Sequence, residues 1–365
     1  MNKWHLRPRS NRPPAGAYPD GTVPLPYPAG WFLLALSHEV RPGGVLTCRL
    51  MGEDIVVYRT RSGRVRAVRP YCPHLGAHLG CGGRVDGELI VCPFHRFAFG
   101  EEGAVARVGP GYTGEPVQDR LAVLPTEEVN RGIFVWAGAD PAEPPAWRFP
   151  SVLPTAPVSI PFIRTEVRSH PQEIFENFLD LGHHRALHGW ADASLPSEPV
   201  RDGHRYAINL RLTRAFPPFG RVTADIDVTL YGLGMAHTVL QDPRRGWRID
   251  ALTALRPVAP WCVEILVGSR MSIDHRQGWW RKWPEPLTGL LADTATWLNV
   301  PVILKDINPD VPIWHAKRYI NPPRLARGDG PVGAFRKWAR QFYPSGTLHP
   351  DTADGPAGTQ EESDV

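Results

Sequence analysis

The sequence predicts an α+β protein in which a small all-β domain precedes a larger domain of mixed helices and strands. Two observations predict this division. Short runs of β-forming residues recur between turn residues from Trp31 to about Trp136. Beyond residue 151, longer strand-like runs alternate with segments of helical spacing. A proline-rich stretch at 137–150 separates the two patterns and is typical of a linker.

The composition is that of a soluble globular protein. The 365 residues are 42% hydrophobic and 21% charged, which is enough chain for two domain cores. The formal net charge of +4 is too small to indicate nucleic-acid binding. Both ends look disordered, because the start is basic and proline-rich and the end is acidic. The expected divisions are an N-terminal arm at 1–28, the all-β domain at 29–140, a linker at 141–150, the second domain at 151–345 and a disordered acidic tail at 346–365.

Membrane and secretion signals are not expected. No uninterrupted apolar run reaches the roughly 18 residues of a spanning helix, and residues 1–14 lack the apolar core of a signal peptide. We therefore expect a cytoplasmic protein without a membrane span. Its five cysteines form an odd and scattered set, which suits a reducing compartment and metal ligation better than disulfides. The chain has no G-x-G-x-x-G after a strand and no Walker loop, so it does not bind a flavin or nicotinamide nucleotide through these motifs. Any electrons that its chemistry requires must then come from another protein.

The all-β domain is predicted from five short runs of β propensity between turn residues. The runs are V-L-T-C-R-L from Val45, D-I-V-V-Y-R-T from Asp54, V-R-A-V-R from Val65, E-L-I-V-C-P from Glu88 and G-I-F-V-W-A from Gly132. Two further runs in the second domain, Y-A-I-N-L-R-L from Tyr206 and V-T-A-D-I-D-V-T-L-Y from Val222, predict longer strands.

The second domain also carries two well-marked helical segments. The first, at about 171–188, has Ser169 with Gln172 as a possible capping box, and Gly189 as a stop. The last helix is expected to begin with Asp329 as N-cap and Pro331 in its first turn. Its apolar stripe comprises Val332, Phe335, Trp338 and Phe342.

The first candidate metal site lies in two Gly- and Pro-rich loops of the all-β domain. Cys72-x-His74 and Cys92-x-x-His95 are separated by 17 residues, so each loop offers one thiolate and one imidazole. This donor set suits zinc or an iron–sulfur cluster and not magnesium or calcium. The spacing alone leaves these two alternatives open.

The second candidate site lies on the helical segment at 171–188. Glu176, Asp180, His183 or His184, and His188 recur at spacings of three to five, which places carboxylates and imidazoles on a shared side. Helical geometry alone favours His184 with His188, because residues four apart are neighbours whereas residues five apart diverge by about 140°.

The C-P-H-L-G-A and C-P-F-H boxes, at this spacing within a small β domain, resemble the Rieske domain of ring-hydroxylating oxygenases. The resemblance implies a [2Fe–2S] cluster in which Cys72 and Cys92 bind one iron and His74 and His95 bind the other. A structural zinc is the alternative. Arg96-Phe97 stand where many members of the family have Gly-Trp, which removes no ligand.

The second set resembles the Glu/Asn-x3-Asp-x2-His-x4-His pattern of the same oxygenases. The resemblance implies a helix-grip (START-like) catalytic domain with a mononuclear Fe(II) bound by His183 and His188, and a helix distorted near Gly182. The third ligand is implied in V-I-L-K-D-I-N-P-D-V-P-I-W, where Asp310 is preferred and Asp306 is the alternative. The same pattern places Asp180 and Glu176 among the catalytic residues.

The family resemblance, closest to steroid 9α-hydroxylase and aminopyrrolnitrin oxygenases, extends over about residues 30–343. It implies the oxygenase component of a Rieske-type monooxygenase, which uses O2 and electrons from a separate reductase or ferredoxin to oxidise an apolar cyclic small molecule. It also implies a head-to-tail homotrimer in which Asp180 bridges His183 of its own chain and His95 of a neighbour. Arylamine N-oxygenation, demethylation and oxidative cyclisation are the alternatives within the family. A Rieske electron carrier without oxygenase activity is the alternative from another class.

Overall fold

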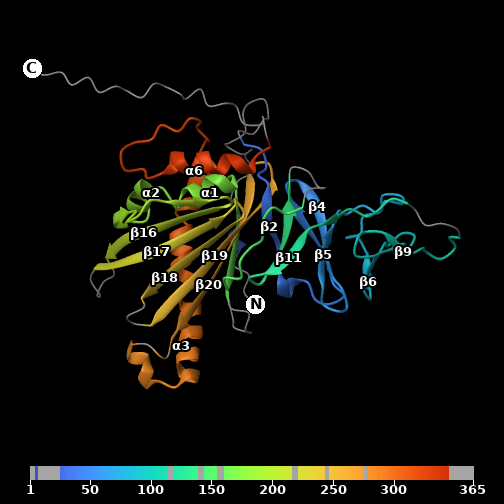
Figure 1. Ribbon diagram of the computed structural model, residues 1–365, viewed down its shortest axis with the longest axis horizontal. Coiled ribbons are helices and arrows are strands. Elements are labelled where there is room, and N and C mark those ends of the chain that lie inside the picture. Colours follow the sequence, from blue (N-terminus) through green and yellow to red (C-terminus); the bar gives the residue numbers. More distant parts are fainter. Residues whose placement is uncertain are drawn as a thin grey trace, which may run out of the picture.

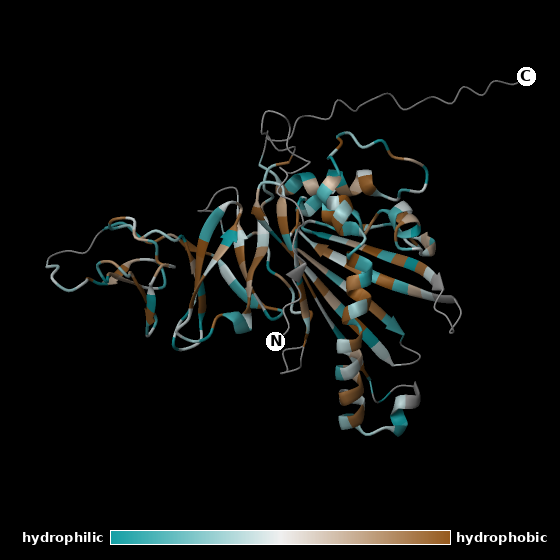
Figure 2. Ribbon diagram, turned by 180° about the vertical axis from the view of Figure 1, so that it is seen from behind, coloured by the Kyte–Doolittle hydropathy of each residue, from teal (hydrophilic) through white to brown (hydrophobic). Residues whose placement is uncertain are grey.

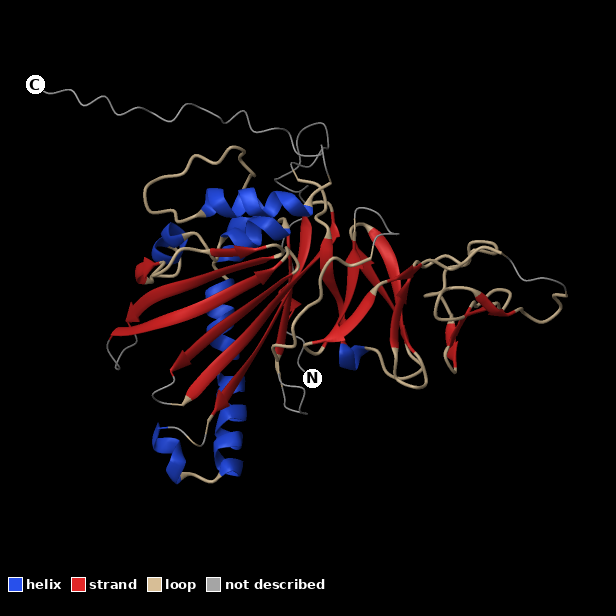
Figure 3. Cartoon of the chain, in the orientation of Figure 1, coloured by secondary structure: helices blue, strands red, loops and turns tan. Residues whose placement is uncertain are grey.

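The computed structural model describes residues 5–6, 25–113, 118–138, 144–153, 160–215, 221–242, 246–274, 276 and 278–344. These residues form a β-rich first domain beside a large sheet that carries nearly all the helices (Figures 1 and 3). The predicted α+β division is therefore confirmed. The expected acidic tail lies wholly outside the described residues, as does most of the N-terminal arm.

The first domain contains two facing sheets and a smaller third one. The two facing sheets have the strand orders β10-β5-β4-β3 and β11-β12-β2, and the apolar core between them includes Phe32, Ile55 and Val135. All five predicted runs form strands; four contribute to these two sheets, and the run from Glu88 forms part of the third sheet. The strands are β2 (Gly30–Leu36), β3 (Val45–Leu50), β4 (Glu53–Arg59), β5 (Val65–Val68), β10 (Val123–Leu124), β11 (Thr126–Val129) and β12 (Gly132–Ala137), with a 3-10 turn η1 (Ser37–Glu39).

The third sheet forms the outer end of the first domain, farthest from the large sheet (Figure 1). Its strands are β6 (Arg84–Asp86), β7 (Leu89–Val91), β8 (Ala98–Phe99) and β9 (Val105–Arg107). The two Cys-His loops lie here, one between β5 and β6 and the other between β7 and β8. Both loops pack on an apolar core that includes Leu79, Ile90 and Phe99.

The second domain is built on a nine-stranded sheet of order β1-β13-β20-β19-β18-β17-β16-β14, with β15 also paired to β16. Apart from the parallel pair β1 and β13, the pairs are antiparallel. The strands are β1 (His5–Leu6), β13 (Phe162–Val167), β14 (Ala191–Ser194), β15 (Val200–Asp202), β16 (Arg205–Ala215), β17 (Arg221–Tyr231), β18 (Met235–Asp242), β19 (Trp247–Ala259) and β20 (Cys262–Ile273).

The helices pack on this sheet, and the largest core lies between them and its strands. They are α1 (Pro171–Glu176), α2 (Leu181–Ala186), α3 (Glu285–Leu298), α4 (Val300–Ile307), α5 (Asp310–Ala316) and α6 (Val332–Ala339), with 3-10 turns η2 (Gly278–Lys282) and η3 (Arg340–Phe342). By length and composition, the run Glu285–Ala316 is apolar enough to cross a membrane. Only 22% of its most apolar window is buried in the protein.

The helix expected at about 171–188 is two short helices. Residues 177–180 separate α1 from α2, so the break precedes Gly182, where we expected a distortion. The N-cap is His170 and not Ser169, because the Nδ1 atom of His170 accepts from the main-chain N–H of Gln172 at 3.2 Å. This ring is fully buried, and burial lowers its pKa to about 3.

The last helix agrees with its predicted apolar stripe but not with its predicted cap. Val332, Phe335, Trp338 and Phe342 are all buried. Asp329 does not cap α6; its carboxylate accepts from the main-chain N–H of Ala326 and closes the preceding turn. Pro331 directly precedes the helix and supplies the fixed φ that favours its start.

The two domains share an apolar cluster, and hydrophobic segments lie on both sides of their junction in Figure 2. Trp31 and Phe134 of the first domain pack in one cluster with Met235 and Leu266 of the large sheet. Gly234, in the turn between β17 and β18, lies so close to Trp31 that an added Cβ would overlap the Trp31 carbonyl oxygen. The main chains of the two domains are therefore in direct contact at this point.

We predict that Gly234→Ala lowers the free energy of unfolding by about 1–3 kcal/mol, because this junction has no room for a methyl group. Gly289→Ala is the matched control, since nothing lies within 4 Å of that position in helix α3. The control should raise stability by about 0.5–1 kcal/mol. Urea unfolding measures both changes, and equal effects of the two substitutions would contradict the close approach.

Candidate metal centres

The two Cys-His loops bring their four predicted ligands to the outer end of the first domain. Cys72 and Cys92 are buried, whereas His74 and His95 are partly exposed, with ring centroids 4.8 Å apart. Burial raises the pKa of the Cys72 thiol to about 11, and the main-chain N–H of His74 acts in the opposite direction. A thiolate in this position therefore requires a cation to stabilise it.

Two thiolates and two imidazoles are also a donor set that can hold a single zinc ion. In this chain the two thiols are buried and the two imidazoles are partly exposed. Buried thiolates on one side and imidazoles on the other fit the two separate irons of a Rieske cluster.

Aromatic rings enclose the imidazole side of this site. The ring of Tyr112 packs edge-on against His74, His95 and Phe97, a contact that the sequence pattern did not indicate. Arg96 has φ +60, in the left-handed region that glycine adopts without strain. This conformation is a physical reason for the glycine of the common motif, and here an arginine adopts it.

The second site joins two segments that lie more than 120 residues apart in the chain. The Nε2 atoms of His183 and His188 lie 2.9 Å apart, and the Asp310 carboxylate approaches them at 3.2 and 3.5 Å. All three side chains are nearly buried, and the Asp310 Oδ1 atom accepts no hydrogen bond. Two imidazoles and a carboxylate converging in this way fit a divalent metal with open positions, such as Fe(II).

The end of helix α2 explains why His183, and not His184, faces this site. The helix ends at Ala186, so His188 lies beyond it and the angular offset of residues five apart in a helix does not apply. His184 also lines the adjoining cavity but does not belong to the cluster of three, and its Nε2 atom lies 3.4 Å from the carbonyl oxygen of Phe178. Burial lowers the pKa of His184 to about 4, which keeps this imidazole neutral.

The three side chains stand at one wall of a cavity of about 280 Å³ between the large sheet and helices α4 and α5. Most of the lining is apolar, and the threonines of β18 and β19 add two hydroxyl groups. Asp306, the alternative third ligand, also lines the cavity but does not belong to the cluster of three. The apolar lining includes Phe178, Leu210, Leu212, Ile226, Val228, Ile265, Val267, Ile303 and Ile307.

Asp180 lies at the start of helix α2, next to the site. Its Oδ1 atom accepts from the main-chain N–H of His183 at 2.8 Å, as an N-cap does. The expected bridge to the His183 ring is not among the hydrogen bonds of the described residues. Asp180 therefore positions His183 through the backbone in this structure.

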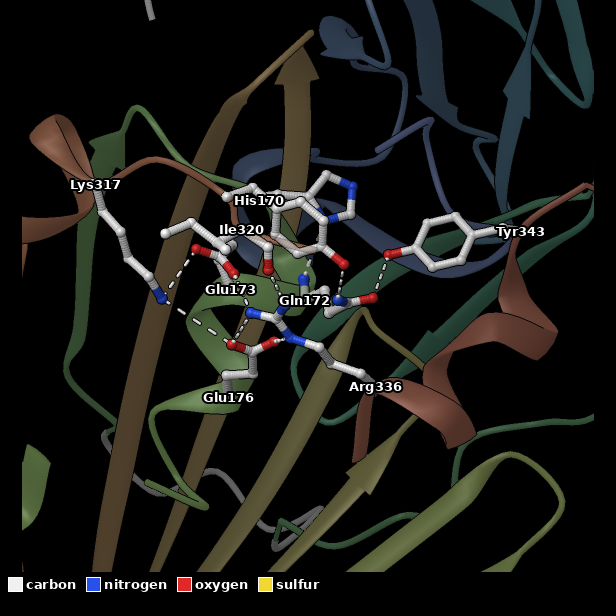
Figure 4. Close-up of polar contacts among 9 residues, drawn as sticks. His170, Gln172, Glu173, Glu176, Lys317, Ile320, Arg336 and Tyr343 are labelled. Carbon is white, nitrogen blue, oxygen red and sulfur yellow. Dashed lines mark hydrogen bonds and ion pairs between the residues drawn. The ribbon is translucent and has the colours of Figure 1, made fainter. Parts of the chain in front are cut away.

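Glu176 does not reach the cluster of three. Its carboxylate forms a two-point ion pair with Arg336, at 2.5 and 2.8 Å, from helix α6 (Figure 4). Glu173 completes the group with Lys317, at 2.9 Å, immediately after helix α5. No local pattern predicts either basic partner, because they lie about 140 and 160 residues further along the chain.

These four charges hold together the segments that carry the site. Burial raises the pKa of Glu173, the Glu176 carboxylate raises it further, and Lys317 acts against both. Arg336 also donates to the carbonyl oxygen of Ile320 and lies 4.5 Å from the ring centroid of Tyr319. Helix α1, which leads to His183, is thereby fixed to α5, which begins with Asp310, and to α6.

Comparisons with known proteins match both domains. Residues 30–119 match the family model of the Rieske [2Fe-2S] domain, and residues 271–343 match the 3-ketosteroid 9alpha-hydroxylase C-terminal domain. Cholesterol 7-desaturase nvd of Xenopus laevis is 30% identical over 347 residues, which cover 88% of this chain and 73% of that protein. A protein of Rhodococcus rhodochrous named probable 3-ketosteroid-9-alpha-monooxygenase, oxygenase component, is 26% identical and covers 88% and 82%.

Solved structures share the fold at low sequence identity. NdmA of Pseudomonas putida, in a structure with caffeine, has a TM-score of 0.62 at 16% identity, with 85% of this chain and 89% of that chain covered. Dicamba monooxygenase bound to dicamba has a TM-score of 0.58 at 16% identity, with 86% and 96% covered. At this identity the likeness concerns the arrangement of the two domains.

We predict that Arg336→Gln lowers the free energy of unfolding by about 3–5 kcal/mol, because it removes the main partner of the buried Glu176 carboxylate and the second partner of buried Glu173. Arg211→Gln is the control: that arginine forms an exposed pair with Asp225 and should contribute less than about 1 kcal/mol. Adding Glu176→Gln to Arg336→Gln should restore part of the loss. Denaturant unfolding gives the free energy of unfolding of all three variants. Similar losses for Arg336→Gln and Arg211→Gln would contradict a stabilising role of the buried charges.

Proposed function

The chain belongs to the Rieske non-heme iron oxygenases, and we propose that it oxidises a ring carbon of an apolar, steroid-like substrate. Two relatives support the substrate class, one named a cholesterol 7-desaturase and the other a 3-ketosteroid monooxygenase component. The single observation that carries the proposal is the largely apolar cavity beside the cluster of two histidines and one aspartate. A polar substrate would leave its hydrogen-bonding groups without partners on most of this wall.

We assign the two ligand sets to the two cofactors of the family. His183, His188 and Asp310 are the proposed ligands of the mononuclear iron, since their donor atoms converge and the carboxylate has an oxygen without a donor. When bound, the [2Fe–2S] cluster stores single electrons, and the mononuclear iron supplies the chemistry that uses O2. The proposed cluster ligands are Cys72, His74, Cys92 and His95.

The protein's own residues have three tasks in this proposal. The apolar wall of β16, β17 and β20 binds the ring system and excludes water from its reacting carbon. Thr238 and Thr253 offer hydroxyl groups that can orient a keto or hydroxyl group of the substrate. Asp180, as the N-cap of α2, fixes the backbone that carries His183.

The electrons come from a separate reductase, as befits an oxygenase component. The name of the Rhodococcus rhodochrous relative describes such a component. The half-exposed imidazoles of His74 and His95 provide the edge of the first domain at which electrons enter and leave. We keep the cytoplasm as the proposed location, in line with five free cysteines.

We further propose a head-to-tail homotrimer. The Cys-His loops and helix α2 lie at opposite ends of the chain (Figure 1), so the two metal sites of one chain are far apart. Around the cluster loops, Tyr71, Leu75 and Phe94 are more than 60% exposed, which is typical of a protein contact surface. Docking this surface beside Asp180 of a second copy would bring His95 to that carboxylate.

The proposed oxidation can take two forms at this site. Hydroxylation inserts one oxygen atom and forms one water, whereas desaturation removes two hydrogens and forms two waters; each consumes O2, two electrons and two protons. The relative with 30% identity is named a desaturase, which favours this reaction as the second candidate. N-oxygenation, demethylation and cyclisation receive no support from the names of these two relatives.

We predict that Asp310→Asn removes the mononuclear iron and leaves the [2Fe–2S] cluster intact. Iron content should fall from about three to about two atoms per chain, while the visible spectrum of the cluster stays unchanged. Asp306→Asn is the control, because Asp306 lines the same cavity without belonging to the ligand cluster. Loss of iron from the Asp306 variant alone would reverse the assignment.

The function is tested by incubating the purified chain with a reductase, NADH and 18O2, and with either a 3-ketosteroid or a sterol. Mass spectrometry should show a product 18 mass units heavier for hydroxylation, or two units lighter for desaturation. Naphthalene and caffeine serve as comparison substrates of other shapes. If neither steroid gives a product or stimulates O2 consumption while both cofactors are present, the proposed substrate class is wrong. Turnover without any reductase would contradict the role of an oxygenase component.

A further inference from the structure

Helix α3 has its large apolar residues on the outside. The face that packs on strand β20 consists of Thr288, Ala292 and Thr296, which are all buried. The opposite side presents leucine and tryptophan side chains to the surroundings, with Leu290 at 62% and Leu298 at 70% exposed. Helices that cover a sheet in water normally show the reverse arrangement. The outer apolar residues of this run are Leu287, Leu290, Leu291, Trp297, Leu298 and Val302.

The helix is held firmly against the sheet, so it does not cross a bilayer in this conformation. The main-chain N–H of Met271 donates to the Thr296 hydroxyl at 3.0 Å, and Arg270 pairs with Asp293. The run from α3 to α5 is nevertheless apolar enough for a bilayer by composition, although most of it is exposed. It is therefore neither a core helix nor a spanning helix. Figure 2 shows the apolar residues along α3.

The segment before α3 contains aromatic and basic residues that are neighbours in the sequence. Residues 279–283 read Trp-Trp-Arg-Lys-Trp, and Trp283 is 40% exposed. Arg281 and Lys282 are exposed and have no ion-pair partner among the described residues. Tryptophan and basic side chains next to an apolar face are typical of segments that lie in the interface of a membrane with anionic lipids.

The same helical run also forms a wall of the cavity. Ile303 and Ile307 of α4 face the cavity, whereas Val302 of the same helix is exposed on the outer apolar side. A surface that rests on lipid would thus place the cavity one helix away from a reservoir of apolar molecules. Because a membrane holds apolar molecules next to this cavity, we favour a lipid surface over an unidentified protein as the partner of this face.

We propose that η2 and the outer face of α3 dock on the surface of an anionic bilayer, with Arg281 and Lys282 at the headgroups and Leu290 and Leu298 among the upper acyl chains. The apolar contact supplies affinity for any bilayer, and the two basic side chains supply a preference for anionic lipid. The proposal goes beyond the oxidation of an apolar substrate, and membrane docking can be measured without turnover.

The test is co-sedimentation of the full chain, with both cofactors loaded, on vesicles of phosphatidylcholine alone and of phosphatidylcholine with phosphatidylglycerol. We expect stronger binding to the anionic vesicles. The double variant Leu290→Glu/Leu298→Glu should weaken binding at least tenfold on both. The double variant Arg281→Gln/Lys282→Gln should weaken binding about fivefold per charge on anionic vesicles and change little on phosphatidylcholine.

Val200→Glu is the matched control, since Val200 is 63% exposed on strand β15 and away from this face. It should leave vesicle binding unchanged. Light scattering on each variant identifies the competing occupant: if Leu290→Glu/Leu298→Glu lowers the oligomer mass, the face is a contact between copies and the lipid proposal is overturned. Absence of vesicle binding by the unmodified chain overturns it as well. Turnover with cyclodextrin-solubilised steroid should be the same in all variants, which separates this outcome from failure of the proposed reaction.

Discussion

The separation of the two ligand sets is the constraint on which every functional feature of this chain depends. The Cys-His loops occupy the outer end of the first domain, whereas His183, His188 and Asp310 lie between the far sheet and its helices (Figure 1). Within one chain, electrons would have to cross the whole molecule to pass from the first ligand set to the second. The exposed apolar residues around the first set form one side of the proposed contact between copies. Asp180, the N-cap residue beside the second set, lies on the other side.

Within the second domain, convergence of distant segments is the corresponding constraint. Helix α2 brings His183, the residues just after it bring His188, and α5 brings the aspartate from more than 120 residues away. The buried group of Glu173, Glu176, Lys317 and Arg336 holds these segments at a fixed relation. A buried ion pair is weak evidence of net stability, yet it defines geometry, because few arrangements satisfy four charges at once. Glu176 thus acts on the site from a distance.

Local features of the sequence predict much of the fold and one candidate site. The spacing of Cys72, His74, Cys92 and His95, the short β runs and the stripe of the last helix depend only on neighbouring residues. The break between α1 and α2, the choice of His183 over His184 and the role of Arg336 depend on tertiary contacts, which no local pattern contains. Asp310 was chosen over Asp306 by family resemblance, and the structure places it with the histidines. The outward apolar face of α3 was missed because Thr288, Asp293 and Thr296 interrupt its apolar residues.

The transfer of electrons between copies is tested most directly by complementation within mixed assemblies. A Cys72→Ser chain lacks the cluster and a His188→Ala chain lacks the mononuclear iron, so each alone should be inactive. Co-expressed with two different tags and purified through both, the mixed trimers should regain roughly a third of the turnover per chain, because one in three head-to-tail contacts of each mixed trimer joins an intact cluster to an intact iron site. Inactive mixed assemblies that retain both cofactors, or full turnover by a monomer, would contradict electron transfer between copies.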